Sequence, residues 1–276
     1  MNSLITIFLA LFVVSIANAK RVLIISDIDD TIKVSHILST AGKVSRASDV
    51  TTPFTGMAQL YQLLVNENSQ DTRVVYLSNA PKEIAGIPAL EFSHRTFLSF
   101  NNFPPGEVDL RESIFEKNHK INEIRRMIEV EKPEILILIG DNGERDPEIY
   151  HQAYLEFSNQ VRIVSFIHQM YSNHVPFYKP NFLAEIGTLI TKEQVGFVTP
   201  IEIAVELKKQ NLLSQKSYNW MIENVVPYIL QEGSFKWDGL KPISFPAFKN
   251  CSDFVWRWKI TPELSPIYDK IKKACR

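Results

Sequence analysis

Three acidic residues stand within four positions directly after an apolar run near the N-terminus. The run "VLII" is followed by Asp27, Asp29 and Asp30 in "SDIDDTIKV". Carboxylates crowded together at the end of a buried strand repel one another, so we expect a positive charge beside them. A metal ion and a lysine from elsewhere in the chain are the candidate partners.

Further polar side chains follow two other apolar runs. Ser78 and Asn79 come directly after "VVYL", and Asp141 and Asp146 lie in "GDNGERD" behind "ILILI". In parallel α/β sheets, ligands collect at the carboxyl ends of the strands. These side chains are therefore expected to meet at one edge of one sheet.

The donors predicted at this edge are oxygens, with no Cys or His among them. A hard, oxygen-only set favours Mg²⁺ over zinc. Because Mg²⁺ readily shares its coordination shell with phosphate oxygens, a phosphorylated substrate is expected. The formal net charge of −1 and sequence pI of about 6.6 give no electrostatic signature for nucleic acid.

The elements that must position these residues alternate along the chain. Strands that are apolar on both faces alternate with amphipathic helices, which predicts an α/β fold with a parallel sheet covered on two sides. We expect a three-layer, Rossmann-like arrangement over about residues 20–175. The expected strands include the runs 22–25, 74–77, 135–139 and 161–167, and the expected helices include 56–68, 118–131 and 146–157.

The pattern changes past about residue 185. Residues 200–230 read as two helices, and "FVWRWKI" at 254–260 alternates like a strand with one aromatic face. This C-terminal helical and aromatic-strand extension is expected to close over the core as an accessory layer. The alternative is an interfacial patch, because aromatic rings near Lys and Arg suit a lipid headgroup zone.

The two ends of the chain carry processing signals. The uncharged segment "LITIFLALFVVSIANA" closes on a small-x-small pattern at 17–19, which favours a cleaved signal peptide over residues 1–19 and a secreted or periplasmic protein. An uncleaved anchor and a buried first strand are the alternatives. In an exported chain, Cys251 and Cys275 form either one disulfide or two unpaired thiols, and "NCS" at 250–252 is a glycosylation acceptor in a eukaryote.

The motifs resemble a known superfamily. D-x-D-x-T at 27–31, Ser78, Lys120 and G-D-x-x-x-x-D at 140–146 are similar, in type and order, to the motifs of the haloacid dehalogenase superfamily. "DIDDTIK", "YLSNAP", "FPPGEVDLRES" and "IGDNGERDPEIY" more closely resemble the catalytic domain of the actin-patch-type phosphatidate phosphatases, over roughly residues 22–167. We therefore expect a haloacid dehalogenase-like catalytic domain at 20–180 and a C-terminal accessory region at 181–276.

The resemblance implies a role for each matching residue. Asp27 is the expected nucleophile and Asp29 the expected general acid and base. Asp141 is expected to hold Mg²⁺ with Asp27 and the main-chain carbonyl of Asp29, helped by Asp146. Lys120 would offset charge between the nucleophile and the phosphate, Ser78 would donate to a phosphoryl oxygen, and Thr31 would fix the loop. The residues expected to bind the substrate are Thr31, Ser78, Asn79 and Arg111.

These features predict a Mg²⁺-dependent phosphomonoester hydrolase that works through an aspartyl-phosphate. The resemblance implies phosphatidate as substrate, with a phospholipid partner and a peripheral contact with a membrane. Two alternatives stay open: a phosphatase for soluble phosphomonoesters, and a secreted lipid- or protein-binding module without turnover. The chain has no G-x-S-x-G elbow, P-loop or Cys-x-x-Cys pair, which excludes serine hydrolases, P-loop ATPases and thiol-redox enzymes of those types.

Overall fold

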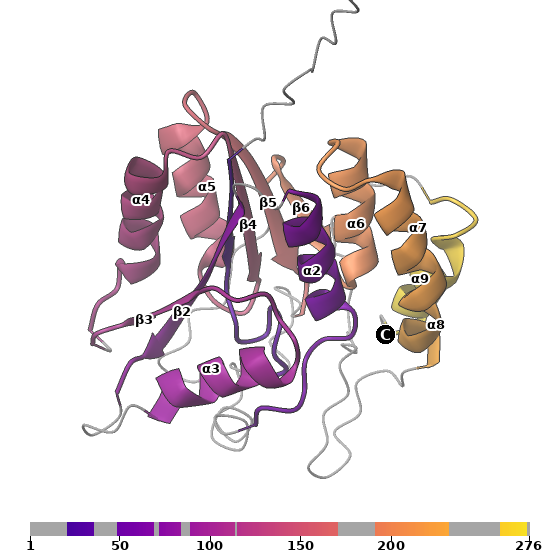
Figure 1. Ribbon diagram of the computed structural model, residues 1–276, viewed down its shortest axis with the longest axis horizontal. Coiled ribbons are helices and arrows are strands. Elements are labelled where there is room, and N and C mark those ends of the chain that lie inside the picture. Colours follow the sequence, from indigo (N-terminus) through magenta and orange to yellow (C-terminus); the bar gives the residue numbers. More distant parts are fainter. Residues whose placement is uncertain are drawn as a thin grey trace, which may run out of the picture.

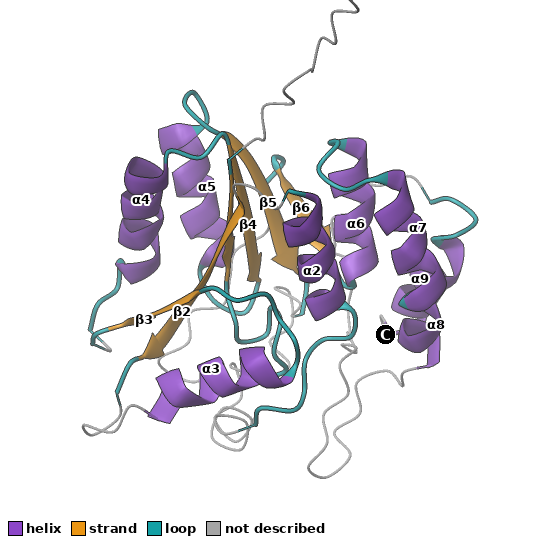
Figure 2. Ribbon diagram, in the orientation of Figure 1, coloured by secondary structure: helices purple, strands orange, loops and turns teal. Residues whose placement is uncertain are grey.

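One six-stranded parallel sheet forms the centre of the molecule (Figures 1 and 2). The computed structural model describes residues 21–35, 49–68, 72–83, 89–113, 115–170, 191–231 and 260–274. The strand order is β3-β2-β1-β4-β5-β6, which confirms the predicted α/β, Rossmann-like fold. The strands are β1 (Val22–Ser26), β2 (Thr72–Pro81), β3 (Glu107–Arg111), β4 (Ile135–Asp141), β5 (Arg162–His168) and β6 (Gln194–Phe197).

Helices cover both faces of the sheet and give it three layers (Figure 1). On one face, α4 and α5 pack on the side chains of Leu23 and Ile25. On the other, α2 and α6 pack on Val22 and Ile24, and α7, α8 and α9 stack beyond them. The helices are α2 (Met57–Glu67), α3 (Ala89–Phe100), α4 (His119–Glu131), α5 (Asp146–Phe157), α6 (Pro200–Lys209), α7 (Gln215–Asn224), α8 (Val226–Gln231) and α9 (Ser265–Ala274).

Strand β1 lies at the centre of the sheet because its apolar side chains pack against the helices on both faces. All five of its residues are buried, and alternate side chains enter opposite cores, as the two-residue period of a strand requires. Ser26 pairs with Tyr76 of β2 and with Ile139 of β4. Two positions further on, Ser78 and Asp141 therefore lie level with the loop that follows β1, at the carboxyl edge of the sheet.

The chain switches sides next to β1, because β2 and β3 lie on one side of it and β4, β5 and β6 on the other. Such a switch point opens a crevice at the carboxyl ends of the two adjacent strands, which is where ligands bind in open α/β sheets. Here those strands are β1 and β4. The two acidic motifs predicted from the sequence follow or end these strands.

Helix α3 lies at the end of the molecule toward which β2 runs (Figure 1). Its inner face carries His94, Phe97 and Leu98, which are buried, whereas Phe92 and Phe100 are exposed. The ring of Phe97 packs 5.6 Å from that of Phe103, so apolar contacts hold this helix beside the carboxyl edge. The sequence patterns used above did not predict α3, β3, β6 or α9.

Packing links the C-terminal helices to the first half of the chain. Gly56 precedes α2 with a φ of 85°, a backbone conformation that glycine adopts most readily. A Cβ at this position would lie 2.3 Å from Val225 Cγ1 and 2.9 Å from Pro200 Cγ. One apolar cluster contains residues of α2, α6, α7, α8 and α9. Strand β6 of the sheet also lies after residue 180 in the sequence. The division of the chain at 180 stays a prediction.

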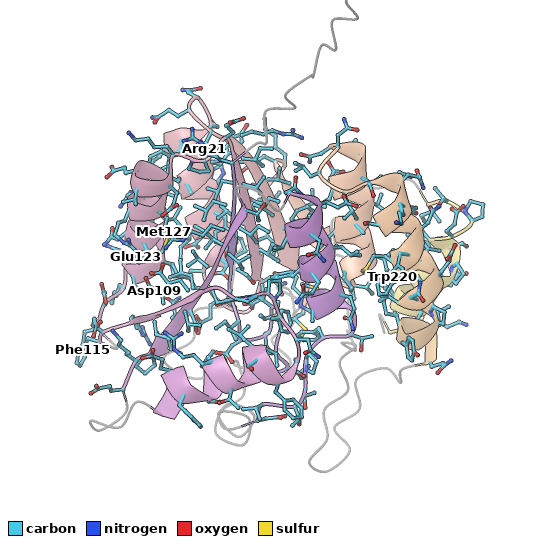
Figure 3. All side chains as sticks on the ribbon, in the orientation of Figure 1. Arg21, Asp109, Phe115, Glu123, Met127 and Trp220 are labelled. Carbon is cyan, nitrogen blue, oxygen red and sulfur yellow. The ribbon has the colours of Figure 1, made fainter. Side chains whose placement is uncertain are left out.

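The predicted pair of helices at 200–230 is three helices in the structure. Helix α7 ends at Asn224, and α8 begins at Val226. Pro227 has no N–H to donate to the preceding turn, so it favours a new helix start over continuation of α7. Trp220 of α7 is 41% exposed (Figure 3).

Several predictions fall on residues outside the described ranges. These are the signal peptide at 1–19, the cysteines Cys251 and Cys275, the acceptor at 250–252 and most of the aromatic strand at 254–260. They stay predictions. None of the described helices combines the length and apolar character that a crossing of the bilayer requires.

Helix α6 begins with a buried capping box. Thr199 accepts from the N–H of Ile201 and contacts the carboxylate of Glu202, whose Oε1 accepts from the N–H groups of Val198 and Thr199 at 3.3 Å. Burial raises the pKa of Glu202 to about 7, although these hydrogen bonds act to lower it. The folded protein therefore binds a proton at Glu202 that the unfolded chain releases above about pH 4.5.

We predict that Glu202 makes the protein less stable as pH rises from about 4.5 through about 7. The Glu202→Gln variant should gain up to about 3 kcal/mol relative to wild type between pH 5 and pH 8, as its amide stays neutral. Urea unfolding at both pH values measures the difference. Each variant is compared with wild type at the same pH, because His168 also makes stability depend on pH. Burial lowers the pKa of His168 to about 4, so this histidine makes the protein less stable at acid pH, opposite to the effect of Glu202.

Glu206→Gln, which removes a half-buried carboxylate from the same helix, controls for the loss of a charge. A gain for Glu202→Gln that is equal at pH 5 and pH 8 contradicts this prediction.

Candidate active site

The carboxylate of Asp27 is held at both oxygens. Lys120 Nζ donates to Oδ1 at 2.8 Å, and Thr31 Oγ1 donates to Oδ2 at 3.0 Å. Its main-chain N–H donates to the carbonyl of Ile139 at 2.8 Å, which fixes the start of the loop against β4. Asp27 is only 4% exposed. The side chain is therefore fixed in one orientation at the switch point of the sheet.

Lys120 is a buried cation between two carboxylates. It lies in the first turn of α4, and its Nζ donates to Asp146 Oδ1 at 2.6 Å as well as to Asp27. Burial acts to lower the pKa of Lys120, but the charges of Asp146 and Asp27 outweigh it and raise that pKa. The lysine is therefore permanently charged. Lys117, three residues earlier in the sequence, is exposed.

Asp27, Asp141 and Asp146 form a compact acidic cluster. Among the residues that the structure describes, each of these three buried side chains offers a carboxylate oxygen within 4.8 Å of the others. Burial raises the pKa of Asp27 and that of Asp141 well above the ordinary value for aspartate, and repulsion within the cluster adds to this. The cluster is thus short of positive charge.

Gly140 allows Asp146 to approach the end of β4. A Cβ at position 140 would lie 2.3 Å from Asp146 Oδ2 and 2.8 Å from its Cβ. Asp146 Oδ2 also lies 3.4 Å from the main-chain N–H of Asp141. The glycine in "GDNGERD" therefore has a steric role, because any larger residue would displace Asp146 from Lys120.

The cluster suits a divalent cation. Three carboxylates against one lysine leave two negative charges in a buried volume, and all the donors are oxygens, which Mg²⁺ and Ca²⁺ prefer. Both oxygens of Asp146 already contact donors, Lys120 and the N–H of Asp141. Asp27 likewise has a donor at each oxygen, and Asp141 Oδ1 accepts from the N–H of Gly143 at 2.5 Å, so all three carboxylates are candidates to hold the cation.

Asp29 is separate from this cluster. Its Oδ1 accepts from Ser35 Oγ at 2.5 Å, and its Oδ2 lies 3.0 Å from His94 Nε2. Burial acts to raise the pKa of Asp29, but the charges of His94 and Lys33 and the hydrogen bonds from His94 and Ser35 outweigh it and hold that pKa well below its usual range. The Asp29 side chain is 20% exposed, so it reaches the opening of the site.

Hydrogen bonds fix the loop between Asp27 and Ser35. Asp30 has a φ of 59°, in the left-handed region that aspartate tolerates better than most residues. Its Oδ1 accepts from the N–H of Ser35 at 2.9 Å, and its carbonyl accepts from His168 Nδ1 at 2.8 Å. His168 stacks on Phe197 with ring centroids 4.7 Å apart. The loop is therefore attached to the far half of the sheet.

The remaining predicted residues line the neighbouring strand ends. Ser78 is buried and accepts from the N–H of Ala80 at 3.0 Å, while Asn79 Nδ2 donates to Glu144 Oε2 at 3.3 Å. Arg111 ends β3 and is half-buried, which lowers its pKa, while the charge of Glu144 opposes that shift. These three residues share the carboxyl edge with Asp27.

Sequence reasoning missed four residues that shape this edge: Ser35, His94, Glu144 and His168. Glu144 stands inside the motif "GDNGERD" and Ser35 directly follows "SDIDDTIKV", so their nearness to the acidic residues in the sequence was a signal. His94 and His168 are reached only through the fold, because α3 and β5 bring them to the loop after β1.

A second group of charges lies on the outer side of β3 and α4, near Asp109 and Glu123 (Figure 3). Burial and the charge of Glu123 raise the pKa of Asp109 to about 7. Arg126 Nε lies 2.6 Å from Glu123, and its NH2 group lies 3.7 Å from Asp109. Arg126 offsets part of this charge, and among the described residues the group of three possible metal ligands lies elsewhere, at Asp27, Asp141 and Asp146.

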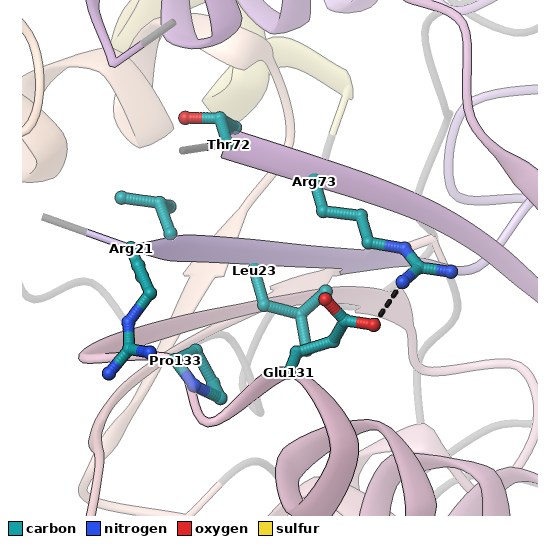
Figure 4. A pocket seen from close by; sticks show the side chains of 7 residues that line it. Arg21, Leu23, Thr72, Arg73, Glu131 and Pro133 are labelled. Carbon is teal, nitrogen blue, oxygen red and sulfur yellow. Dashed lines mark hydrogen bonds and ion pairs between the residues drawn. The ribbon is translucent and has the colours of Figure 1, made fainter. Parts of the chain in front are cut away.

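A cavity of about 250 Å³ lies at the opposite edge of the sheet (Figure 4). Arg21, Thr72 and Pro133 line it, and Arg73 pairs there with Glu131. The cavity adjoins the amino ends of β1 and β2, far along the strands from the acidic cluster. It is therefore not part of the candidate active site.

Comparison with known proteins identifies the family. The model of the family described as "Phosphatidate phosphatase APP1, catalytic domain" matches residues 22–169. The chain belongs to this family. The chain is 28% identical over 187 residues to "Phosphatidate phosphatase APP1" of Saccharomyces cerevisiae. The aligned region covers 62% of this chain. The chain spans about 30% of the length of the yeast protein. The expected resemblance is confirmed, and the acidic cluster lies inside the matched residues of this phosphatase family.

We predict that Lys120→Met destabilises the protein by about 3 kcal/mol at pH 7, because it leaves Asp27 and Asp146 buried without their cation. The matched variant Lys117→Met removes an exposed lysine three residues earlier and should change stability by no more than about 0.5 kcal/mol. Urea unfolding in EDTA measures both. Equal stability of the two variants contradicts a buried ion pair at Lys120.

Proposed function

We propose that the protein is a Mg²⁺-dependent phosphomonoester hydrolase that works through an aspartyl-phosphate on Asp27. The observation that carries this proposal is the fixed carboxylate of Asp27, bound by Lys120 and Thr31 inside an acidic cluster at the switch point of the sheet. A carboxylate is a nucleophile that needs no deprotonation at neutral pH. The family match supports the same reaction class.

In the first step, an oxygen of Asp27 attacks phosphorus. The bond between phosphorus and the ester oxygen breaks, and the electron pair stays on that oxygen, which takes a proton from the carboxyl group of Asp29. Lys120 offsets the charge of the phosphoryl oxygens near Asp27, and Ser78 donates a hydrogen bond to them. The products of this step are an alcohol and phosphorylated Asp27.

In the second step, a water oxygen attacks phosphorus while the carboxylate of Asp29 takes the proton of that water. The bond from phosphorus to Asp27 breaks, which regenerates the Asp27 carboxylate, the protonated Asp29 and inorganic phosphate. Mg²⁺, held by Asp27, Asp141 and the main-chain oxygen of Asp29 with Asp146 behind them, would supply positive charge to the phosphoryl group in both steps.

The substrate we propose is phosphatidate, which would yield diacylglycerol. The name of the family supports this choice, as does the name of the yeast relative. Arg111 and Asn79, at the ends of β3 and β2, are proposed to meet the phosphate-bearing part of the lipid. Access to such a substrate implies a peripheral contact with a membrane, and export through residues 1–19 would put that membrane outside the cytoplasm.

We predict release of phosphate from phosphatidate with Mg²⁺, and loss of at least about 100-fold in rate with EDTA or in Asp27→Asn. A panel of phosphatidate, lysophosphatidate and soluble phosphomonoesters, with phosphate release as readout, measures this. Asp269→Asn, which changes an exposed aspartate of α9, is the matched control and should retain the wild-type rate.

The outcomes separate the candidate functions. Equal rates on phosphatidate and on soluble esters contradict a lipid preference and favour a general phosphomonoesterase. No release from any ester, together with binding to liposomes, contradicts the enzyme and favours a binding module.

A further inference from the structure

The ring of His94 is oriented by a contact on its own helix. Nδ1 lies 2.6 Å from the carbonyl oxygen of Leu90, which can only accept, so Nδ1 carries a hydrogen. The other nitrogen, Nε2, then faces Asp29 Oδ2 at 3.0 Å. The contact with Leu90 thus aims the second nitrogen of the ring at the proposed acid and base. One hydrogen lies between Nε2 and Asp29 Oδ2, on Nε2 when Asp29 is ionised and on the carboxyl group when the ring is neutral.

His94 is buried in the interior, where an imidazole nitrogen without a hydrogen-bond partner would destabilise the protein. It is 2% exposed, against 20% for the side chain of Asp29. A buried polar ring requires a partner at each nitrogen, and here both partners are present. Phe97 and Leu98, one turn further along α3, are also buried, so the face of the helix that carries His94 is turned toward the interior.

Ser35 completes the contacts of Asp29. Its hydroxyl donates to Oδ1 at 2.5 Å, so each oxygen of the carboxyl group has one partner. The Ser35 N–H is itself bound to Asp30, which ties this partner to the loop. The direction of the Asp29 carboxyl group is therefore set from two sides, by its own loop and by a helix 65 residues further on.

We propose that His94 is a positioning residue that acts through Asp29. From α3 it holds the carboxyl group in the direction from which Asp29 transfers a proton to the departing ester oxygen. This inference rests on the proposed function, because it assigns a task within that reaction. It adds to the motifs a residue from a helix that none of them includes.

The transferred proton allows a specific test. When the bond between phosphorus and the ester oxygen breaks, a strongly basic alkoxide needs a proton from Asp29, whereas p-nitrophenolate, a weak base, departs without one. The constant kcat/KM reports the steps up to departure of the alcohol. Loss of positioning should therefore lower kcat/KM for an alkyl ester and spare that for p-nitrophenyl phosphate.

We expect His94→Leu to lower kcat/KM for a water-soluble, short-chain phosphatidate by about 10- to 100-fold, the usual effect of losing a hydrogen bond to a charged group. For p-nitrophenyl phosphate the loss should stay within about threefold. His94→Gln keeps an N–H donor of similar reach and should recover most of the activity on the alkyl ester. Arg95→Leu, which removes an exposed partner of Glu91 from the same helix, should match wild type on both substrates.

A second measurement needs only the lipid. Phosphatidate labelled with ¹⁸O at the ester oxygen reports how far proton transfer accompanies cleavage. His94→Leu should increase the ¹⁸O isotope effect on kcat/KM toward the value of Asp29→Asn. Thermal unfolding of each variant verifies that it is folded.

Equal losses on both esters, with an unchanged isotope effect, overturn the proposal and leave His94 with a structural role. Asp29→Asn separates this failure from that of the proposed function. If Asp29→Asn itself shows no dependence on the leaving group, or if wild type releases no phosphate, the proposed reaction fails and the inference fails with it. If Asp29→Asn shows the dependence and His94→Leu does not, only the inference fails.

Discussion

The ion pairs of Lys120 with Asp27 and Asp146 are the interaction on which the rest of the site depends. Three carboxylates cannot stay ionised together in a buried volume, and one lysine offsets only part of their charge. Burial and the unbalanced negative charge raise the pKa of Asp27 and that of Asp141, and a bound divalent cation would balance this charge. The proposed roles of nucleophile, metal ligand and phosphate partner thus depend on one electrostatic constraint.

The sheet satisfies this constraint by geometry. The central strand β1 ends beside β4 at the switch point, so acids from distant parts of the sequence meet there without strain in the strands. Gly140 admits Asp146, and His168 attaches the loop of Asp30 to the other half of the sheet. Asp29, bound instead by Ser35 and His94, stays outside the cluster. Two aspartates two positions apart are thereby given different surroundings, which raise the pKa of Asp27 and lower that of Asp29.

The sequence alone predicted the sheet and most of the acidic cluster, because long apolar runs and closely spaced acids are local signals. It did not predict β3, which is short and half exposed with charged residues at alternate positions, or β6, which has four residues. The contact of His94 with Asp29 was also not predicted from the sequence. No local pattern marks His94, and only the packing of α3 through residues such as Phe97 brings its ring to the loop. Contacts between distant segments depend on tertiary packing, which residue spacing does not encode.

The central claim is that the unbalanced charge of Asp27, Asp141 and Asp146 binds a divalent cation next to Lys120. Anomalous diffraction from crystals grown with Mn²⁺ in place of Mg²⁺ tests it without reference to turnover. One strong peak is expected within coordination distance of Asp27 and Asp141, and it should disappear in crystals of Asp141→Asn. No peak at the cluster, or a peak that persists in that variant, would contradict the account.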